Sequence, residues 1–283
     1  MDQGVLDDFI LDALSEDIGD GDHTSLACIP EHLNGRAELL VKEHGVLAGL
    51  KVAQRVFHHA DQRLKCSILI EDGSLISPGD IVFSLSGPRR SILKAERLTL
   101  NILQRMSGIA TQTAKYVSQV KGTSAKILDT RKTTPNLRFL EKEAVRIGGG
   151  YNHRMGLYDM IMIKDNHIDF AGGIEKAIGK TVEYLEKTKR DLKIEIEARS
   201  LRELETILEV GKIHRIMFDN FTPEETLKAV NMINNRYETE SSGGINLSTI
   251  RAYAETGVDF ISVGALTHQI NSLDMSLKAA ENL

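Results

Sequence analysis

The second half of the chain alternates between short apolar runs and longer amphipathic stretches. The apolar runs are rich in Ile, Met, Val and Phe and lie within residues 126–130, 160–165, 193–198, 215–220 and 259–264. Apolar positions at helical spacing occur between them, in residues 173–188, 200–210, 222–235 and 247–256. Strand and helix that alternate over about 150 residues predict parallel strands joined by crossover helices.

The first part of the chain has a different pattern. Residues 5–14 have the spacing of a short amphipathic helix, and several β-like runs follow within residues 36–85. Residues 91–120 return to a helical pattern, which we expect to break near 107–108 because a glycine follows a serine there. This pattern predicts an α+β unit that ends near residue 110.

Several of the later strands end in polar residues or glycine. These strand ends carry Asp129, Lys164, Glu197, Asp219 and Gly264. A doubly wound sheet and an α/β barrel both place their sites at the carboxyl ends of strands. We favour the barrel, because its closure would bring together ends that come from nearly every strand.

Composition narrows the classes of protein. A net charge of −5 disfavours a general nucleic-acid surface, and no apolar run approaches the roughly 18–20 residues of a membrane span. The amino terminus lacks the basic start and apolar core of a signal peptide. Cys28 and Cys66 match no metal spacing and cannot form a disulfide framework, so we expect both to be buried in a reduced, cytoplasmic protein.

Basic residues gather at two of the predicted strand ends. Arg131, Lys132 and Arg138 follow the first strand, and Thr130 precedes the pair Arg131-Lys132. His153 and Arg154 follow three glycines, and Lys164 ends the second strand. Each segment taken alone could be a solvated loop. Together, in an acidic chain, they predict a site for an anion that carries several charges.

Carboxylates face the same predicted interior. The period of a strand places Glu195 and Glu197 on one face, where burial is costly unless the acids are paired with cations, hydroxyls or a metal. An edge strand with both acids in water is the alternative. Glu197 lies nearer the strand end and is the better candidate, while Asp219 could equally bind a ligand or cap a helix.

Glycines at the last strand ends complete the pattern. Ser242, Gly243 and Gly244 precede a predicted helix, and Val263, Gly264 and Ala265 follow the last strand. Barrels often bind phosphate in these loops. Cations, acids and a glycine-lined pocket suit a phosphorylated sugar and a second anion. No local motif supports a serine hydrolase, a zinc enzyme or a dinucleotide-dependent enzyme.

The chain resembles the quinolinate phosphoribosyltransferase family nearly from end to end. Ordered matches begin at Glu96-Arg97 and residues 107–111 and continue through DTRKTTP, GGGYNHR, IKDNH, EIEA, FDN, SSGGI and VGALTH. The resemblance implies an N-terminal open α/β sandwich followed by an incomplete, TIM-like α/β barrel. We place these domains at residues 1–111 and 112–283, and expect the second to end in a helix.

The resemblance also implies roles for individual residues. Arg97 resembles an arginine supplied across a homodimer, so that the active site is shared between subunits. The residues that resemble the pyridine-dicarboxylate site are Arg131, His153, Arg154 and Lys164, and by the same resemblance Lys132 and Lys164 would meet the diphosphate. Glu197 and Asp219 would bind the ribose hydroxyls and magnesium. The residues that resemble the 5′-phosphate site are Ser242, Gly243, Gly244 and Gly264, with Thr130, Val263 and Ala265 beside these groups. A register shifted by two would replace Glu197 by Glu195.

The implied activity is that of a pentosyltransferase. Phosphoribosyl diphosphate and quinolinate would give nicotinate mononucleotide, carbon dioxide and diphosphate in NAD biosynthesis, with Mg²⁺ and without an organic cofactor. Lys132, Lys164, Glu197 and Asp219 are the expected catalytic residues, and neither nucleic acid nor membrane is an expected partner. Three alternatives stay open: a paralogue with another anionic acceptor, a nicotinate phosphoribosyltransferase, and a non-catalytic sugar-phosphate binding protein.

Overall fold

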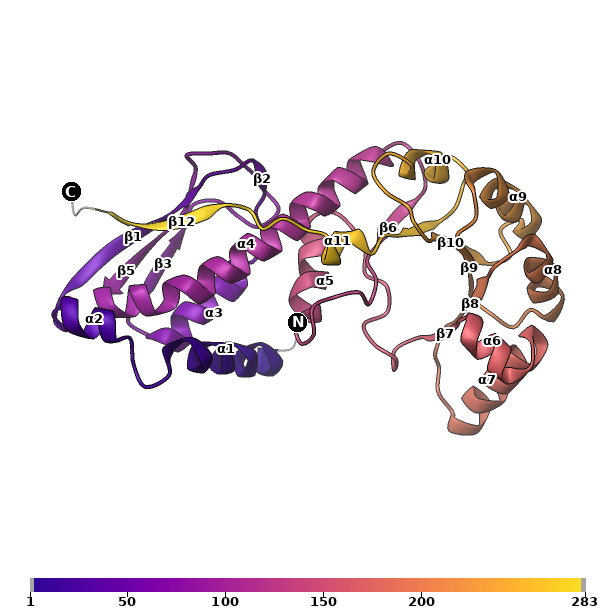
Figure 1. Cartoon of the computed structure of the whole chain (residues 1–283), viewed down its shortest axis with the longest axis horizontal. Helices are drawn as coiled ribbons and strands as arrows, with labels where there is room; N and C mark the ends of the chain where they lie inside the picture. The colour runs from indigo at the N-terminus through magenta and orange to yellow at the C-terminus, as the bar shows by residue number, and fades with distance from the viewer. Residues whose placement is uncertain (1–2, 281–283) are drawn as a thin grey trace. The chain divides into compact units, whose positions relative to one another are not determined.

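A computed structural model of the chain describes residues 3–280 and contains two units, each built around its own sheet (Figure 1). The first unit combines residues 3–114 with Phe139–Gly149 and residues 270–280, and the second combines Lys115–Arg138 with Gly150–Gln269. The single boundary expected at residue 111 does not describe this arrangement, because a helix and the end of the chain return to the first unit.

The first unit holds a four-stranded antiparallel sheet in the order β12-β1-β5-β3. Its strands are β1 (Asn34–Val41), β2 (Gly45–Val46), β3 (Lys65–Ile68), β4 (Leu75–Ile76), β5 (Ile81–Pro88) and β12 (Met275–Ala280), of which β2 and β4 form a separate pair. Its helices are α1 (Gln3–Ile18), α2 (His23–Cys28), α3 (Leu50–Ala60), most of α4 (Arg89–Gln119) and nearly all of α5 (Arg138–Ile147).

The expected C-terminal helix is a strand. Residues 275–280 pair antiparallel with β1, from Val41 beside Met275 to Arg36 beside Ala280. Met275 and Leu277 alternate with more exposed neighbours and face the core of the first unit. This period of two is that of a half-buried strand.

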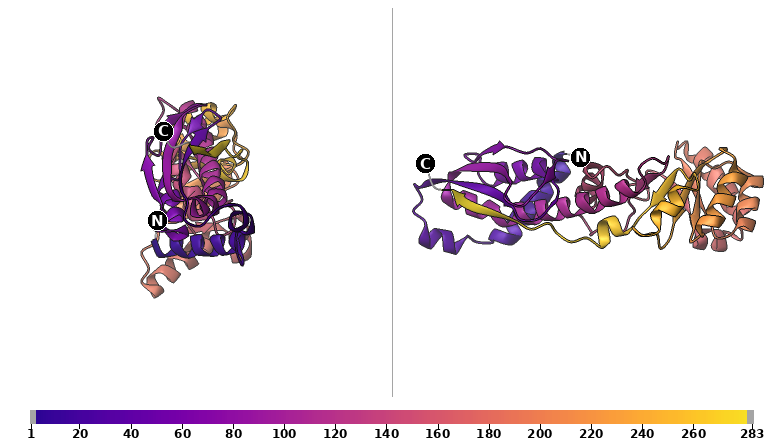
Figure 2. Two further views of the ribbon diagram at one scale, coloured as in Figure 1. Left: turned by 90° about the vertical axis from the view of Figure 1, so that its left-hand side faces the viewer. Right: turned by 90° about the horizontal axis from the view of Figure 1, so that it is seen from above.

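The expected helix break near 107–108 is also absent, because α4 is one helix of 31 residues (Figures 1 and 2). Gly108 has another role: a Cβ atom there would lie 2.2 Å from the carbonyl oxygen of Asn271. Glycine thus allows the returning chain to cross the helix closely. The expectation for the cysteines is wrong as well, since Cys28 is exposed and Cys66 is only partly buried.

The second unit is an incomplete barrel of parallel strands in the order β6-β11-β10-β9-β8-β7. Figure 1 shows helices on the outer side of this curved sheet. The strands are β6 (Lys126–Leu128), β7 (Ile161–Ile163), β8 (Ile194–Ala198), β9 (Arg215–Asp219), β10 (Glu238–Ser242) and β11 (Phe260–Ser262). The helices are α6 (Asp165–Ala171), α7 (Ile174–Thr188), α8 (Leu201–Val210), α9 (Pro223–Ile233), α10 (Ile250–Ala254) and α11 (Ala265–His268).

The five strands predicted in this half are confirmed, but the pattern missed β10. Its sequence is Glu-Thr-Glu-Ser-Ser, although its three central residues are buried. A polar strand is stable there because Glu240 pairs with Arg215 and His153, and the Thr239 hydroxyl donates a hydrogen bond of 2.7 Å to Asp259 Oδ2. Across residues 3–280, no helix has the length and apolar character needed to cross a membrane.

Candidate active site

The carboxyl ends of the parallel strands surround a cavity of about 900 Å³, and all of its lining residues belong to the second unit. It brings together every predicted site residue except Arg97: Thr130, Arg131, Lys132, His153, Arg154, Lys164, Glu197, Asp219, Ser242, Gly243, Gly244, Val263, Gly264 and Ala265. Arg97 is exposed on α4 in the first unit. The barrel therefore gathers side chains that are more than 130 residues apart in sequence.

Positive charge is concentrated on the side of the cavity formed by the ends of β6 and β7. Burial, together with the nearby positive charge of Arg131, lowers the pKa of Arg154. Two guanidinium groups that repel one another are stabilised when an anion binds between them. Arg138 does not line the cavity. It donates hydrogen bonds to Thr133 Oγ1 at 2.9 Å and to the Met155 carbonyl at 3.0 Å, and so holds the loops beneath these cations.

Glu197 lies at the mouth of the barrel and is fixed from two directions. Its Oε1 lies 3.5 Å from Lys164 Nζ, and its Oε2 accepts a hydrogen bond of 3.3 Å from the backbone N–H of Asp165, the first residue of α6. A carboxylate at a helix N-terminus also interacts favourably with the helix dipole. Glu197 is thus held in one orientation at the edge of the cavity.

Asp219 ends β9 and lines the same cavity. The sequence left open whether it caps the next helix. In the structure, Thr222 caps α9: its Oγ1 accepts a hydrogen bond of 3.2 Å from the backbone N–H of Glu225, and its own backbone N–H donates to Glu225 Oε2 at 2.9 Å. Pro223 occupies the first turn of the helix. The carboxylate of Asp219 is therefore not used as the helix cap.

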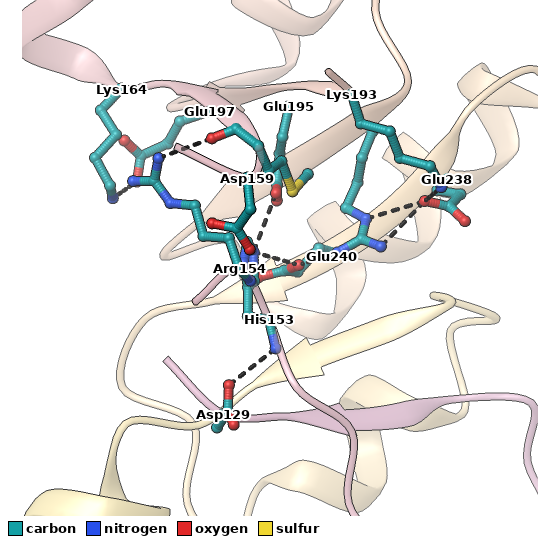
Figure 3. Close-up of polar contacts among 12 residues, drawn as sticks. Asp129, His153, Arg154, Asp159, Lys164, Lys193, Glu195, Glu197, Glu238 and Glu240 are labelled. Atoms are coloured by element: carbon teal, nitrogen blue, oxygen red, sulfur yellow. Dashed lines mark hydrogen bonds and ion pairs between the residues drawn. The ribbon is translucent and has the colours of Figure 1, made fainter. Parts of the chain in front are cut away.

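Below the mouth, the barrel contains a buried charged cluster, which we call the floor: His153, Glu195, Arg215 and Glu240. In Figure 3, Glu195 and Glu240 point from β8 and β10 toward His153. His153 Nε2 lies 3.0 Å from Glu195 Oε2 and 3.3 Å from Glu240 Oε2. Arg215 Nη1 donates to Glu240 Oε2 at 3.0 Å. The floor therefore pairs its buried charges internally.

The floor also shifts proton affinities. Burial and the negative charge of Glu240 raise the pKa of Glu195 to about 7. Burial lowers the pKa of His153, but hydrogen bonds to the two carboxylates outweigh this effect and raise it. Glu195, His153 and Glu240 titrate together, so a proton that this cluster gains or loses belongs to the three side chains as a group and not to one of them.

Glycine is required at one of the predicted phosphate-binding turns, and a second glycine borders the cavity closely at another. Gly243 has φ of +99°, and a Cβ atom there would lie 2.2 Å from Asn220 Oδ1. A Cβ atom at Gly264 would lie 2.9 Å from His268 Nε2 and 3.0 Å from Lys132 Cδ. A side chain is therefore excluded at Gly243, whereas one at Gly264 would press on the side chains of His268 and Lys132, and both turns border the cavity. The helix predicted over residues 247–256 is present but shorter, since α10 spans Ile250–Ala254.

Two sets of residues could be considered for a metal ion. Among residues 3–280, the one group of three or more suitable ligand atoms within 4.8 Å is His153, Glu195 and Glu240. These atoms already bond to one another and to Arg215. Glu197 and Asp219 instead border the cavity where a phosphorylated ligand would bind, and Mg²⁺ is usually held by one or two carboxylates plus substrate phosphates. The mouth fits a magnesium ion better than the floor does.

Sequence reasoning missed part of the site. Glu240 and Arg215 were not considered, and neither was Ser262, while Asn220 and His268 were given no role in the cavity that they line. A signal for Glu240 exists, because Glu238 and Glu240 have the same spacing of two as Glu195 and Glu197.

Cations, acids and glycine turns around one cavity at the strand ends define an α/β-barrel protein of the class that binds phosphorylated, multiply charged ligands.

Comparisons with known proteins identify the family. Residues 22–107 match the N-terminal domain of quinolinate phosphoribosyl transferase, and residues 109–278 match its C-terminal domain. Quinolinate phosphoribosyltransferase (decarboxylating) 1b of Nicotiana tabacum is 45% identical over 281 residues, covering 94% of this chain and 80% of that protein. The probable nicotinate-nucleotide pyrophosphorylase (carboxylating) of Bacillus subtilis is 42% identical over 262 residues, covering 93% and 89%. The crystal structure of NadC from Streptococcus pyogenes has a TM-score of 0.94 at 40% identity and covers 99% of both chains. The chain belongs to the quinolinate phosphoribosyltransferase family.

Proposed function

We propose that the protein transfers the phosphoribosyl group of phosphoribosyl diphosphate to quinolinate and releases carbon dioxide and diphosphate, giving nicotinate mononucleotide for NAD biosynthesis. The observation that carries this proposal is the single cavity that joins Arg131, Arg154 and Lys164 with Glu197 and Asp219. Cations suit the two carboxylates of quinolinate, and acids suit the ribose hydroxyls. The names of the relatives given above support the same reaction.

In this mechanism the protein acts mainly by positioning and by electrostatics. Arg131 and Arg154 hold the dicarboxylate, and Lys132 and Lys164 face the diphosphate. Glu197 and Asp219 fix the ribose and would hold Mg²⁺, which when bound neutralises negative charge on the diphosphate. Held in this way, the ring nitrogen lies in line with C1 of the ribose, so that ordering is largely complete before reaction.

The bond changes balance without an organic cofactor. The lone pair of the ring nitrogen forms the bond to C1 as the bond from C1 to the diphosphate oxygen breaks and its electron pair leaves with diphosphate. The nitrogen is then positively charged. It stabilises the electron pair left on the adjacent ring carbon when the carboxylate departs as carbon dioxide, and that carbon takes up a proton. Fixed cations and acids stabilise the charges that develop.

Backbone groups provide the place for the 5′-phosphate. The turns at Ser242, Gly243 and Gly244 and at Val263, Gly264 and Ala265 border the cavity, and a side chain is excluded at Gly243. Backbone N–H groups can approach a phosphate closely at such turns. Thr130 supports the adjoining loop after β6, since its Oγ1 accepts a hydrogen bond of 3.0 Å from the backbone N–H of Lys132.

The assignment is tested by carbon dioxide release from quinolinate with phosphoribosyl diphosphate and Mg²⁺, with nicotinate as the parallel substrate. We expect release with quinolinate and no nucleotide from nicotinate. Nucleotide from nicotinate would favour a nicotinate phosphoribosyltransferase. Binding of phosphoribosyl diphosphate without turnover of quinolinate would favour a paralogue with another anionic acceptor, and no turnover with any acceptor would favour a binding protein.

We further propose a cytoplasmic homodimer in which Arg97 completes the site of the partner subunit. The support is that Arg97 is exposed on α4, while every other predicted site residue lines one cavity of the second unit. Arg97→Ala and Lys164→Ala should each abolish activity. Mixed dimers of the two variants should regain part of it, because one of their two sites would carry neither substitution. Demonstrably mixed dimers without activity would contradict a shared site.

A further inference from the structure

Asn220 connects the ends of two neighbouring strands at the mouth of the barrel. In the parallel register of β9 and β10, Asp219 is paired with Ser242. One residue further on, the backbone N–H of Asn220 donates a hydrogen bond of 2.9 Å to the carbonyl of Ser242. The acid proposed to bind the ribose and the turn proposed to bind the 5′-phosphate are therefore adjacent, and Asn220 follows the first and bonds to the second.

The backbone of Asn220 has a conformation that few residue types adopt. Its φ is +57°, in the left-handed region, which asparagine and glycine tolerate better than other residues. The buried rings of Phe218 and Phe221 flank this turn and stack with their centroids 5.4 Å apart. Tyr253 donates a hydrogen bond of 2.9 Å to the carbonyl of Phe221. The backbone that carries the Asn220 side chain is therefore fixed.

The side chain of Asn220 lies against the turn at Gly243. A Cβ atom at Gly243 would lie 2.2 Å from Asn220 Oδ1 and 2.6 Å from Asn220 Cγ. The amide thus occupies the space that any side chain at Gly243 would need. Gly243 also has a left-handed backbone, with φ of +99°, so the two residues fit together at the ends of their strands.

The amide of Asn220 can also reach a ligand. The residue is exposed and lines the cavity together with Asp219 and the turn from Ser242 to Gly244. Within residues 3–280, no group of the protein forms a hydrogen bond with this amide. An asparagine amide offers two N–H donors and carries no charge, so it can bind a phosphate oxygen without adding to the negative charge of Asp219.

We propose that Asn220 is a further substrate-binding residue, whose side-chain amide donates a hydrogen bond to the 5′-phosphate at the Gly243 turn. The inference rests on the proposed function, because it adds one ligand-binding residue for the phosphoribosyl group in the same cavity. The amide approaches the phosphate from the end of β9, and backbone N–H groups of the turn approach it from the end of β10. A sugar phosphate bound in this way is aligned with Asp219, which directly precedes Asn220.

The first test measures the binding of ribose 5-phosphate to the full chain by calorimetry, without added metal. Asn220→Asp keeps the size of the side chain and tolerates the same backbone conformation, but it replaces the N–H donors by a negative charge. Asn220→Gly keeps the backbone conformation and removes the amide. We expect the Kd to rise about tenfold in Asn220→Gly and more than about 30-fold in Asn220→Asp. A Kd within a factor of about two of the parent value in either variant would overturn the proposal.

The second test separates ligand binding from a purely structural role. Asn220→Gly should raise the KM for phosphoribosyl diphosphate about tenfold and change the KM for quinolinate less than about twofold, because the cations at the ends of β6 and β7 are unchanged. Equal increases in the two KM values would indicate a general disturbance of the cavity and contradict a specific contact.

Asn234→Gly is the matched control for both tests. Asn234 is also exposed and left-handed, with φ of +49°, but it ends α9 and does not line the cavity. We expect this variant to leave the Kd and both KM values unchanged. A change as large as that of Asn220→Gly would show that loss of a left-handed asparagine acts through the stability of the barrel, and the proposal would then be wrong.

Failure of the proposed function gives a separate result. If the parent chain binds ribose 5-phosphate but releases no carbon dioxide from quinolinate, the reaction assignment is wrong, while the Kd values of the two variants still decide the role of Asn220. If carbon dioxide is released but the variants bind ribose 5-phosphate as the parent does, the reaction stands and the role of Asn220 is wrong. A parent chain that does not bind ribose 5-phosphate would exclude a phosphate site at the Gly243 turn, and with it the proposal.

Discussion

The mouth and the floor of the barrel use the same kinds of residue in opposite ways. Glu195 and Glu197 lie two residues apart on β8 and face the same side. Glu197 borders the cavity, whereas Glu195 is fully buried against His153. The comparison shows that depth along one strand decides whether a carboxylate serves a ligand or the structure.

Charge balance explains the difference. The floor groups come from β8, β9, β10 and the loop before β7 and form ion pairs with one another, and Arg215 is shared between Glu238 and Glu240. At the mouth, Arg131 and Arg154 repel one another. A buried charge without a partner is costly, so the floor must be complete in the free protein. The mouth is open to solvent and can leave part of its charge for a substrate.

The largest effect expected from this comparison is on activity. Glu197→Gln should lower kcat/KM by about 100- to 1000-fold, because a carboxylate that stabilises charge in the transition state is lost. Glu195→Gln should cost less than about tenfold, since the amide oxygen still accepts from His153 Nε2. Steady-state kinetics with both substrates, and unfolding curves as the control for stability, check the pair. A larger loss for Glu195→Gln would show that the register of β8 had been assigned to the wrong acid.

The second prediction concerns the stability of the floor. Glu240→Gln should lower the free energy of unfolding by about 2 kcal/mol, because Arg215 and His153 lose a buried partner charge. Glu238→Gln is the matched control: it lies on the same strand and binds the same arginine, but its side chain is 40% exposed. We expect that control to cost less than about 1 kcal/mol, measured by urea unfolding. Equal losses would mean that burial does not set the strength of these pairs.

The same contrast explains how far the sequence could predict the structure. The strands rich in Ile, Met and Phe were identified by composition and length, and the mouth residues followed because strand ends meet at one edge of the sheet. β10 was missed because its buried residues are Thr239, Glu240 and Ser241. Thr239 bonds to Asp259, which directly precedes β11, and Glu240 pairs with Arg215 on β9 and with His153 in the loop before β7. A local pattern does not contain partners that only the assembled barrel brings near.

The return of the C-terminal segment to the first unit was a second source of error in the sequence predictions. Residues 275–280 alternate as a strand should, but their partner β1 lies more than 230 residues earlier. Gly108 was interpreted as a helix break, because the close approach of Asn271 cannot be seen in the sequence around it. In both places a contact distant in sequence decided the structure.

A smaller effect separates the cations of the mouth. Lys132→Ala should raise the KM for phosphoribosyl diphosphate about tenfold, because one charge-assisted contact is lost, and should change the KM for quinolinate much less. Arg131→Ala is the counterpart, for which we expect the opposite order. The two KM values for each variant decide the assignment. If Lys132→Ala weakened quinolinate more, the roles of these neighbouring cations would be exchanged.

The smallest effect is expected where the same substitution is made at the surface. Glu255 is 57% exposed and pairs with Arg251 at 2.6 Å, a distance shorter than the contacts that Glu240 makes to Arg215 and His153. Glu255→Gln should nevertheless lower the free energy of unfolding by less than about 0.5 kcal/mol, because water screens and replaces an exposed partner. If the urea curves instead showed a loss of unfolding free energy as large as that of Glu240→Gln, the distance within the ion pair, and not its burial, would set its contribution to stability. The difference between floor and mouth could then no longer be attributed to depth.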